Sequence, residues 1–213
     1  MEKPAEERRN RRPRRSKADI EAAIEKAAIK QIKRMGFAHS QVTDIVKEAE
    51  IEPIVFYNRY KNLNDFFDQF VTHYDHWLKD ACKGKSSPTN SEEYAKLLGG
   101  LLDYLHENDI ITELLRWEVS ENTSTTRRMA KVHEEDVNDY VDHLMQHAKH
   151  TTETDERAVM ALVVAGLFYL TLHKERSSFA GIDIKTTEGR DRIKKALKQI
   201  GTSLYPRQRI TKK

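Results

Sequence analysis

Three polar side chains within four residues, Asn58, Arg59 and Lys61, are of types that bind nucleic acid. Arginine suits bidentate contacts with guanine or phosphate, and asparagine can read adenine or bind phosphate. The apolar residues just before them, Pro-Ile-Val at 53–55, can touch the methyl groups of thymine. These types at this spacing predict contacts with DNA, provided that the segment forms an exposed helix.

Two short helices are expected to position these side chains. Apolar residues at 42, 45, 46 and 49 repeat at helical spacing, and Ser40 is predicted to start that helix. A turn follows at 50–52, and Pro53 opens a second helix that runs to about residue 60, with Phe56 packed inward. Two short helices joined by such a turn are the plan of a helix-turn-helix, which places its second helix in the major groove.

Helical periodicity covers the rest of the chain, so we predict an all-α fold of about nine helices. The first helix is expected over 17–35, between Ser16 as its N-cap and Gly36 at its end. The later helices are expected over 64–83, from Ser91 as a cap, from Asp109, over 125–149, from Asp155, and after a loop at 181–189. The apolar segment 159–172 is predicted to be buried on most sides.

Composition limits the class of protein. The 213 residues are 38% hydrophobic and 33% charged, which suits a soluble helical protein of one or two domains. The net charge of +3 is too small to identify a nucleic-acid binder, but residues 1–17 hold eight basic residues against three acids. The single Cys82 excludes an intrachain disulfide. We expect no apolar run long enough to span a bilayer, and the N-terminus lacks the apolar region of a signal peptide. The sequence therefore predicts a cytoplasmic protein with no membrane partner.

The residues of the N-terminal segment that follow the pattern of a known family are Gly36, Ser40, Val42, Ile45, Ala49, Ile51, Phe56, Tyr57, Tyr60, Asn62 and Phe66. On these residues, the segment from about residue 17 to 70 resembles the TetR/AcrR family of transcriptional regulators. The resemblance implies that Tyr57 donates its hydroxyl to a backbone phosphate and that the later helices hold a small-molecule site. It also implies a homodimer formed through the last two helices with two-fold symmetry.

The predicted DNA contacts join this resemblance to the basic N-terminal arm. The arm, residues 1–16, is expected to lie along phosphates or to enter a minor groove, and the alternative is a solvated tail. The full set of predicted DNA-binding residues is Arg14, Arg15, Ser40, Gln41, Pro53, Ile54, Val55, Tyr57, Asn58, Arg59 and Lys61.

Aromatic and polar residues of the later helices are candidates for an effector pocket. The alternative interpretation of the same aromatic residues is that they fill the core. No metal site or cofactor is predicted, since His143 and His147 lack the other features of a zinc motif, and no catalytic motif indicates an enzyme. The predicted ligand-binding residues are Tyr94, Tyr104, Trp117, Glu118, Met129, His133, Phe168 and Tyr169.

The sequence therefore predicts four parts: a basic flexible arm at 1–16, a helix-turn-helix domain at 17–63, a helical regulatory and dimerisation domain at 64–205, and a basic tail at 206–213. The predicted function is a ligand-responsive DNA-binding regulator, a dimeric repressor of a palindromic operator. Glu50, Glu52, Ile54 and Leu63 depart from the family pattern and support an alternative. In that alternative, a degenerate helix-turn-helix dimer binds a small molecule or a protein with little specific DNA binding.

Overall fold

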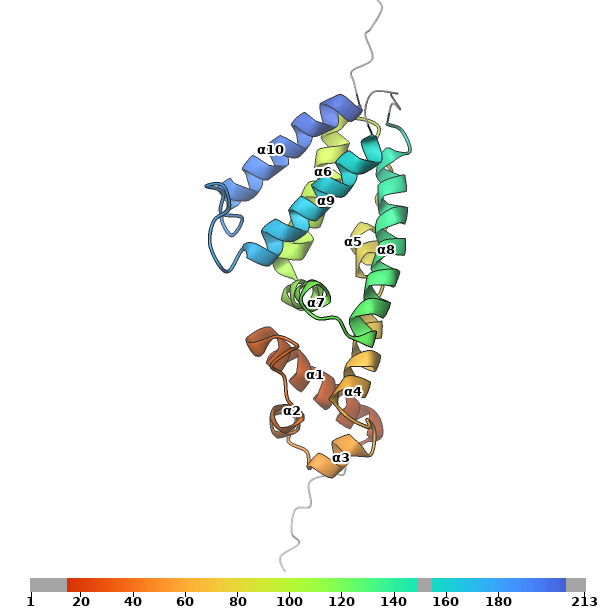
Figure 1. The fold of residues 1–213 in the computed structure, drawn as a ribbon, viewed down its shortest axis with the longest axis vertical. Helices are drawn as coiled ribbons and strands as arrows, with labels where there is room; N and C mark the ends of the chain where they lie inside the picture. The colour runs from red at the N-terminus through yellow and green to blue at the C-terminus, as the bar shows by residue number, and fades with distance from the viewer. Residues whose placement is uncertain (1–14, 149–154, 206–213) are drawn as a thin grey trace, which may run out of the picture.

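The computed structural model describes residues 15–148 and 155–205, and these residues form an all-α fold. They make up helices α1 to α10 and a short 3-10 helix, η1. Within the described ranges the single β-like feature is an isolated bridge between Phe179 and Ile182. The molecule is elongated, with α1–α3 at one end and α6, α8, α9 and α10 in the body at the other (Figure 1). The predicted fold class is confirmed.

Two short-range signals set the ends of the first helix in the N-terminal unit, which comprises α1, α2 and α3. Helix α1 spans Lys17–Met35 as predicted, and its N-cap Ser16 forms a reciprocal capping box with Asp19. Gly36, with a φ of 77°, ends the helix in a conformation that glycine adopts readily. Helix α2 spans Val42–Glu48, and α3 spans Pro53–Tyr57.

The predicted helix over 64–83 is wrong as a single element. It is divided into α4 (Leu63–Phe70), η1 (Val71–Tyr74) and α5 (Trp77–Cys82). At the break, the Asp75 carboxylate accepts a 2.7 Å hydrogen bond from Arg128, and the ring of His76 lies 3.2 Å from the Asp136 carboxylate. Both partners lie on α8, so long-range polar contacts bend a segment whose local periodicity is helical.

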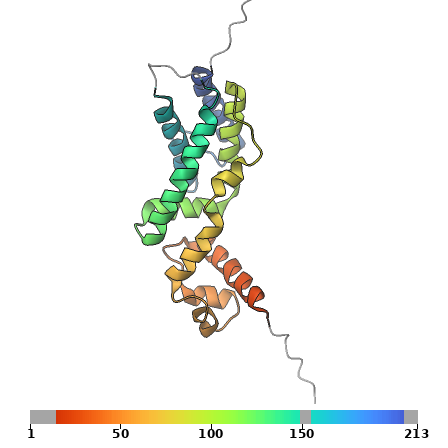
Figure 2. The ribbon, with the colours of Figure 1, turned by 90° about the vertical axis from the view of Figure 1, so that its right-hand side faces the viewer.

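The body consists of α6 (Ser91–Glu107), α7 (Asp109–Ser120), α8 (Ser124–Met145), α9 (Glu156–His173) and α10 (Thr187–Leu204). Figure 2 shows the body above the N-terminal unit, with α4 running between them. Two predicted details differ: the cap of α6 is the side chain of the preceding asparagine rather than Ser91, and α8 ends before the predicted residue 149.

One apolar core runs through the unit and the body, but α9 is not buried as predicted. Only Met160, Val164, Leu167 and Thr171 of α9 are buried, and Leu162 is 74% exposed. The prediction failed because the other helices of one chain cover a single face of α9. The 18 residues of α9, with a mean hydropathy of 1.4, also meet the length and composition of a membrane span, which corrects the prediction that no run is long enough.

Candidate DNA-binding surface and effector cavity

Helix α3, the candidate recognition helix, presents two large apolar side chains to solvent at the end of the molecule. Ile54 is 63% exposed and Tyr57 is 51% exposed, whereas Phe56 is fully buried. Phe56 packs against Tyr60 and Phe66, with ring centroids 5.1 and 5.7 Å away, and so anchors α3 to α4. The prediction that Phe56 packs inward is confirmed. Helix α3 is shorter than predicted, because it ends at Tyr57 and a turn carries the following residues.

The turn between α2 and α3 depends on an unusual backbone conformation. Glu50 has a φ of 53°, in the left-handed region that a non-glycine residue rarely adopts. Arg15 donates a 2.9 Å hydrogen bond from Nη1 to the Ala49 carbonyl, and its guanidinium lies 3.6 Å from the Glu50 carboxylate. The described end of the arm therefore contacts the turn, rather than extending freely from the domain.

Two residues predicted to contact DNA hold the domain together instead. The Arg59 side chain is only 16% exposed: Nη1 donates to the Val55 carbonyl at 2.8 Å, and Nε lies 4.0 Å from Glu21. The Ser40 side chain is buried, and its hydroxyl donates to the Gly36 carbonyl at 2.8 Å. Both polar groups thus bond within the domain in this conformation, which gives both residues a structural role, and their contact with DNA stays a prediction.

The other predicted DNA contacts fall into three groups. Gln41, Pro53, Asn58 and Lys61 are exposed on or beside the helix-turn-helix, and Val55 is half-buried. Their contact with DNA stays a prediction. Arg14, with residues 1–13 of the arm and the basic tail at 206–213, lies outside the described residues.

A cavity of about 270 Å³ lies between α5, α7, α8 and α9. Its polar lining includes Glu118 and His133, whose Oε2 and Nδ1 atoms are in close contact, with Glu134 beside them. Most other lining residues are apolar: Trp77, Leu78, Leu115, Val119, Ala130, Val137, Ala161, Val164, Ala165, Phe168 and Leu172.

Of the predicted ligand-binding residues, only Glu118, His133 and Phe168 line this cavity. Tyr104 stacks behind Trp77, with ring centroids 6.1 Å apart and nearly parallel planes. Tyr169 is 48% exposed and stacks on His173 at the surface.

Tyr94, Met129 and Trp117 are core residues, as the alternative interpretation had it. Tyr94 is fully buried and its hydroxyl donates to the Met160 sulfur at 3.1 Å, while Met129 is 1% exposed. Trp117 faces the N-terminal unit: its ring stacks on Phe37 with centroids 4.5 Å apart and planes 4° apart. On α7, Trp117 thus faces the N-terminal unit while its neighbour Glu118 lines the cavity. Tertiary packing decides which side chains of the helix line the cavity.

Trp77 was missed as a lining residue. Its place on the inner face of the 64–83 segment was visible in the helical periodicity, but that signal cannot distinguish a cavity wall from a filled core. Trp77 lies 4% exposed on α5, immediately after the break that Asp75 and His76 create.

Direct contacts join the N-terminal unit to the body at α7. Besides the stack of Trp117 on Phe37, the Phe67 ring of α4 meets Trp117 edge-on at 5.5 Å. Asp109 at the start of α7 lies 3.7 Å from Lys33 of α1 and 3.7 Å from Lys174 at the end of α9. A displacement of α7 would therefore change its contacts with α1, α4 and the end of α9 at the same time.

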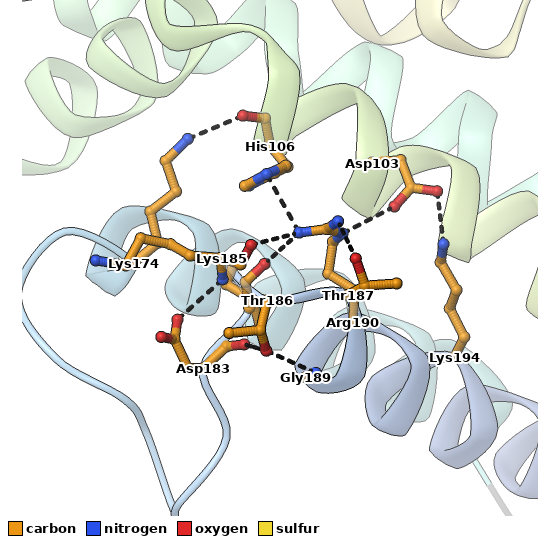
Figure 3. Close-up of polar contacts among 11 residues, drawn as sticks. Asp103, His106, Lys174, Asp183, Lys185, Thr186, Thr187, Gly189, Arg190 and Lys194 are labelled. Carbon is orange, nitrogen blue, oxygen red and sulfur yellow. Dashed lines mark hydrogen bonds and ion pairs between the residues drawn. The ribbon is translucent and has the colours of Figure 1, made fainter.

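A polar cluster fixes the connection between α9 and α10 against α6 (Figure 3). Arg190 donates 2.9 Å hydrogen bonds to the carbonyls of Ile184 and Lys185, and it lies 3.2 Å from His106 Nε2. Lys174 is 5% exposed and donates to the His106 carbonyl at 3.1 Å. These contacts hold the start of α10 in place beside α6, so the α9–α10 connection is part of the framework of the body.

Two further hollows lie on the outer surface. An apolar groove of about 410 Å³ between α9 and α10 is lined by residues such as Leu162, Leu170, Ile193 and Ile200. A more polar groove of about 730 Å³ runs beside α6 and contains Lys85, Lys96 and Lys194 as well as Glu93 and Asp103.

Comparison with known proteins gives a structural match. No family model and no curated protein matches this sequence. FadR from Bacillus halodurans superposes with a TM-score of 0.63 at 16% identity, covering 87% of this chain and 97% of that one. A TetR-like regulator from Rhodococcus sp. RHA1 gives 0.65 at 15% identity, covering 89% and 99%. FadR from Bacillus subtilis, solved in complex with stearoyl-CoA, gives 0.59 at 15% identity, covering 83% and 97%.

The chain has the TetR-like fold. This agrees with the resemblance seen in the sequence, and it extends that resemblance from about residues 17–70 to most of the chain. In the TetR-like arrangement found here, the exposed face of α3 and the cavity are in separate parts of the molecule, joined by α4, α5 and α7.

Proposed function

We propose that this protein is a ligand-responsive DNA-binding transcriptional regulator of the TetR/AcrR family, located in the cytoplasm. The observation that supports this function best is the outward projection of Ile54 and Tyr57 at the end of a TetR-like chain, remote from the cavity in the body. One end then binds DNA and the other binds the effector. The proposal includes repression in the absence of the effector.

The proposed DNA contacts combine phosphate positioning with an apolar base contact. Tyr57 donates its hydroxyl to a phosphate, and Ile54 packs on a thymine methyl group in the major groove. Arg59 supports them from behind, because its bond to the Val55 carbonyl braces the last turn of α3. The recognition helix therefore reads DNA mainly by shape and methyl contacts, with Asn58 and Lys61 at its end.

Homodimerisation is proposed through the exposed faces of α9 and α10. Leu162, at 74% exposure, is one of several apolar residues along the groove between these helices. An apolar patch of this kind marks an interaction surface, and two-fold pairing would bury the same patch on both subunits. The pairing sets two α3 helices on successive major grooves, so the operator is expected to be roughly palindromic.

Effector control is proposed to act through α7. The cavity contacts Leu115, Glu118 and Val119 of α7, while Trp117 on the same helix stacks on Phe37 of the N-terminal unit. An effector that fits one position of α7 better than another shifts the population between two arrangements of the recognition helices. The shift is limited by the difference in its affinity for the two arrangements.

The test is a DNA selection from a random-sequence library, followed by binding titrations on the selected site. Tyr57→Phe removes only the hydroxyl and is expected to weaken binding by about tenfold, the loss of one charge-assisted hydrogen bond. Tyr74→Phe is the matched control, because Tyr74 lies on η1, away from α3 and from the exposed faces of α9 and α10. Full wild-type affinity in Tyr57→Phe would refute the assignment of Tyr57.

A second candidate function rests on the acidic residues beside α3. Glu50 and Glu52 are both exposed at the turn that precedes the recognition helix, where a DNA phosphate would approach. In this candidate the protein is a helical dimer that binds a small molecule or a protein and binds DNA only weakly and without specificity. A selection that enriches no sequence, together with DNA binding that disappears at physiological salt, would favour it over the regulator.

A further inference from the structure

We infer that the cavity between α5, α7, α8 and α9 binds a small organic cation, with an apolar body and one positively charged nitrogen. The inference deepens the proposed function, since it names the chemical class of the effector. The sign of the lining charges, the aromatic walls and the size of the cavity support it independently.

The charged side chains around the cavity favour a cation. Among the described lining residues the carboxylates are Glu118 and Glu134, the imidazole of His133 is the only basic group, and lysine and arginine are absent. Glu118 is 17% exposed at its side chain and is held against the ring of His133. A positive ligand would gain attraction mainly from Glu118, which is poorly solvated, and less from Glu134, which is exposed and screened by water, whereas both carboxylates would repel an anion.

The aromatic lining also suits a cation. The rings of Trp77 and Phe168 lie 6.0 Å apart at an angle of 52°, so they form two inclined walls. Tyr104 stacks on the far side of Trp77 and His133 meets it edge-on at 6.2 Å, which fixes the indole in place. The faces of aromatic rings attract organic cations, and tryptophan does so most strongly. Trp77 therefore provides a fixed surface for the charged end of the ligand.

The size and the remaining polar group limit the ligand further. A volume of about 270 Å³ corresponds to roughly nine water molecules at about 30 Å³ each, which is small for a ligand site. A long-chain acyl-CoA, the ligand of the Bacillus subtilis FadR complex, needs far more space and positive partners for its phosphates. The indole Nε1 of Trp77 is buried out of reach of the cavity, so the lining offers no N–H donor there and suits a ligand whose body is apolar.

The test compares three probes of similar shape on the purified full-length protein without DNA. Benzyltrimethylammonium carries the positive charge, neopentylbenzene is its neutral isostere, and phenylacetate carries a negative charge. Titration calorimetry or quenching of tryptophan fluorescence gives the dissociation constants. The cation is expected to bind at least about tenfold more tightly than the isostere, and phenylacetate more weakly than both.

Two variants test the assignment to this cavity. Glu118→Gln keeps the shape of the side chain and removes its charge, and it is expected to weaken cation binding about tenfold without changing binding of the neutral isostere. Glu135→Gln is the matched control, because Glu135 is an exposed residue of α8 outside the cavity lining, and it should bind the cation as the wild type does. Far-UV circular dichroism and thermal unfolding establish that both variants are folded.

The outcomes separate this inference from the proposed function. Tight cation binding that depends on Glu118 supports the inference even if the DNA selection fails, in which case the helical dimer of the second candidate remains. Equal binding of the cation and its isostere, preference for phenylacetate, or an equal loss in Glu118→Gln and Glu135→Gln would overturn the inference. A sequence-specific operator would then leave the regulator standing with a different effector.

Discussion

At the scale of single residues, the same side-chain type has different roles according to its neighbours. Tyr57 is exposed at the end of α3, whereas Tyr94 is buried and bonded to the Met160 sulfur. Arg59 was expected to reach DNA but donates to the Val55 carbonyl instead. Spacing alone did not show whether a polar group bonds to a near neighbour in sequence, as Arg59 does to Val55, or to a distant segment, as Tyr94 does to Met160.

His106 is a residue whose titration should affect stability. Its Nε2 must accept a hydrogen bond from Arg190, because a guanidinium can only donate, and its Nδ1 is buried without a partner among the described residues. Burial lowers the pKa of His106 below its ordinary value of 6.5, and the charges of Arg190 and Lys174 lower it further, against the opposing effects of Asp103 and Glu107.

Acid is therefore expected to destabilise the fold through His106. Between the lowered folded pKa and the ordinary value, the unfolded chain binds more protons than the folded one, so stability falls as the pH falls through that window. Thermal unfolding measured from about pH 7.5 to 5 should show a smaller drop in Tm for His106→Gln than for the wild type. His39→Gln, at an exposed histidine of the N-terminal unit, is the control and should follow the wild type. Equal slopes in all three proteins would rule out His106 as the source.

At the scale of elements, α7 is the helix that both parts of the molecule share. Trp117 packs on Phe37 of the N-terminal unit and on Phe67 of α4, while Leu115 and Glu118 of the same helix line the cavity. The division of the segment 64–83 into α4, η1 and α5 also places Trp77 in the cavity wall. The elements themselves were largely predictable, but the faces that they present to each other were not.

Removing the Trp117 ring should destabilise the joint between the two parts. Trp117→Ala is expected to lower the free energy of unfolding by about 3–5 kcal/mol, the usual cost of truncating a buried tryptophan. Val119→Ala on the same helix, where the side chain is 71% exposed, should change it by no more than about 0.5 kcal/mol. Denaturant titrations followed by circular dichroism measure both values. A similar small change in the two variants would show that the stack of Trp117 on Phe37 contributes little.

At the scale of the whole molecule, the apolar face of α9 requires a covering surface. The helix is long and apolar enough to resemble a membrane span, yet it packs against α6, α7 and α8 through its buried residues, and its exposed face continues into the groove with α10. In the proposed dimer, a second copy of the chain would cover this exposed face and would supply the second of two ends that contact DNA.

Placing a charge in that face should separate the subunits. Leu162→Glu is expected to convert a dimer into a monomer at micromolar concentration, because two-fold pairing would bury the charge in both subunits. Ile54→Glu, which alters a 63% exposed apolar residue at the other end of the molecule, should remain dimeric and lose DNA binding. Analytical ultracentrifugation gives the mass of each variant. A monomeric wild type, or a dimeric Leu162→Glu, would contradict the proposed interface.

The sequence by itself determined the order of the helices and the local signals that bound them. Ser16, Gly36 and Pro53 act through hydrogen bonds and backbone angles of adjacent residues, so their effects are visible without the fold. Only the tertiary structure decided that Trp77 lines a cavity and Trp117 stacks on Phe37, that Ser40 and Arg59 face inward, and that α9 is half uncovered. Periodicity shows that a side chain leaves water, but the atoms that replace the water come from segments far along the chain.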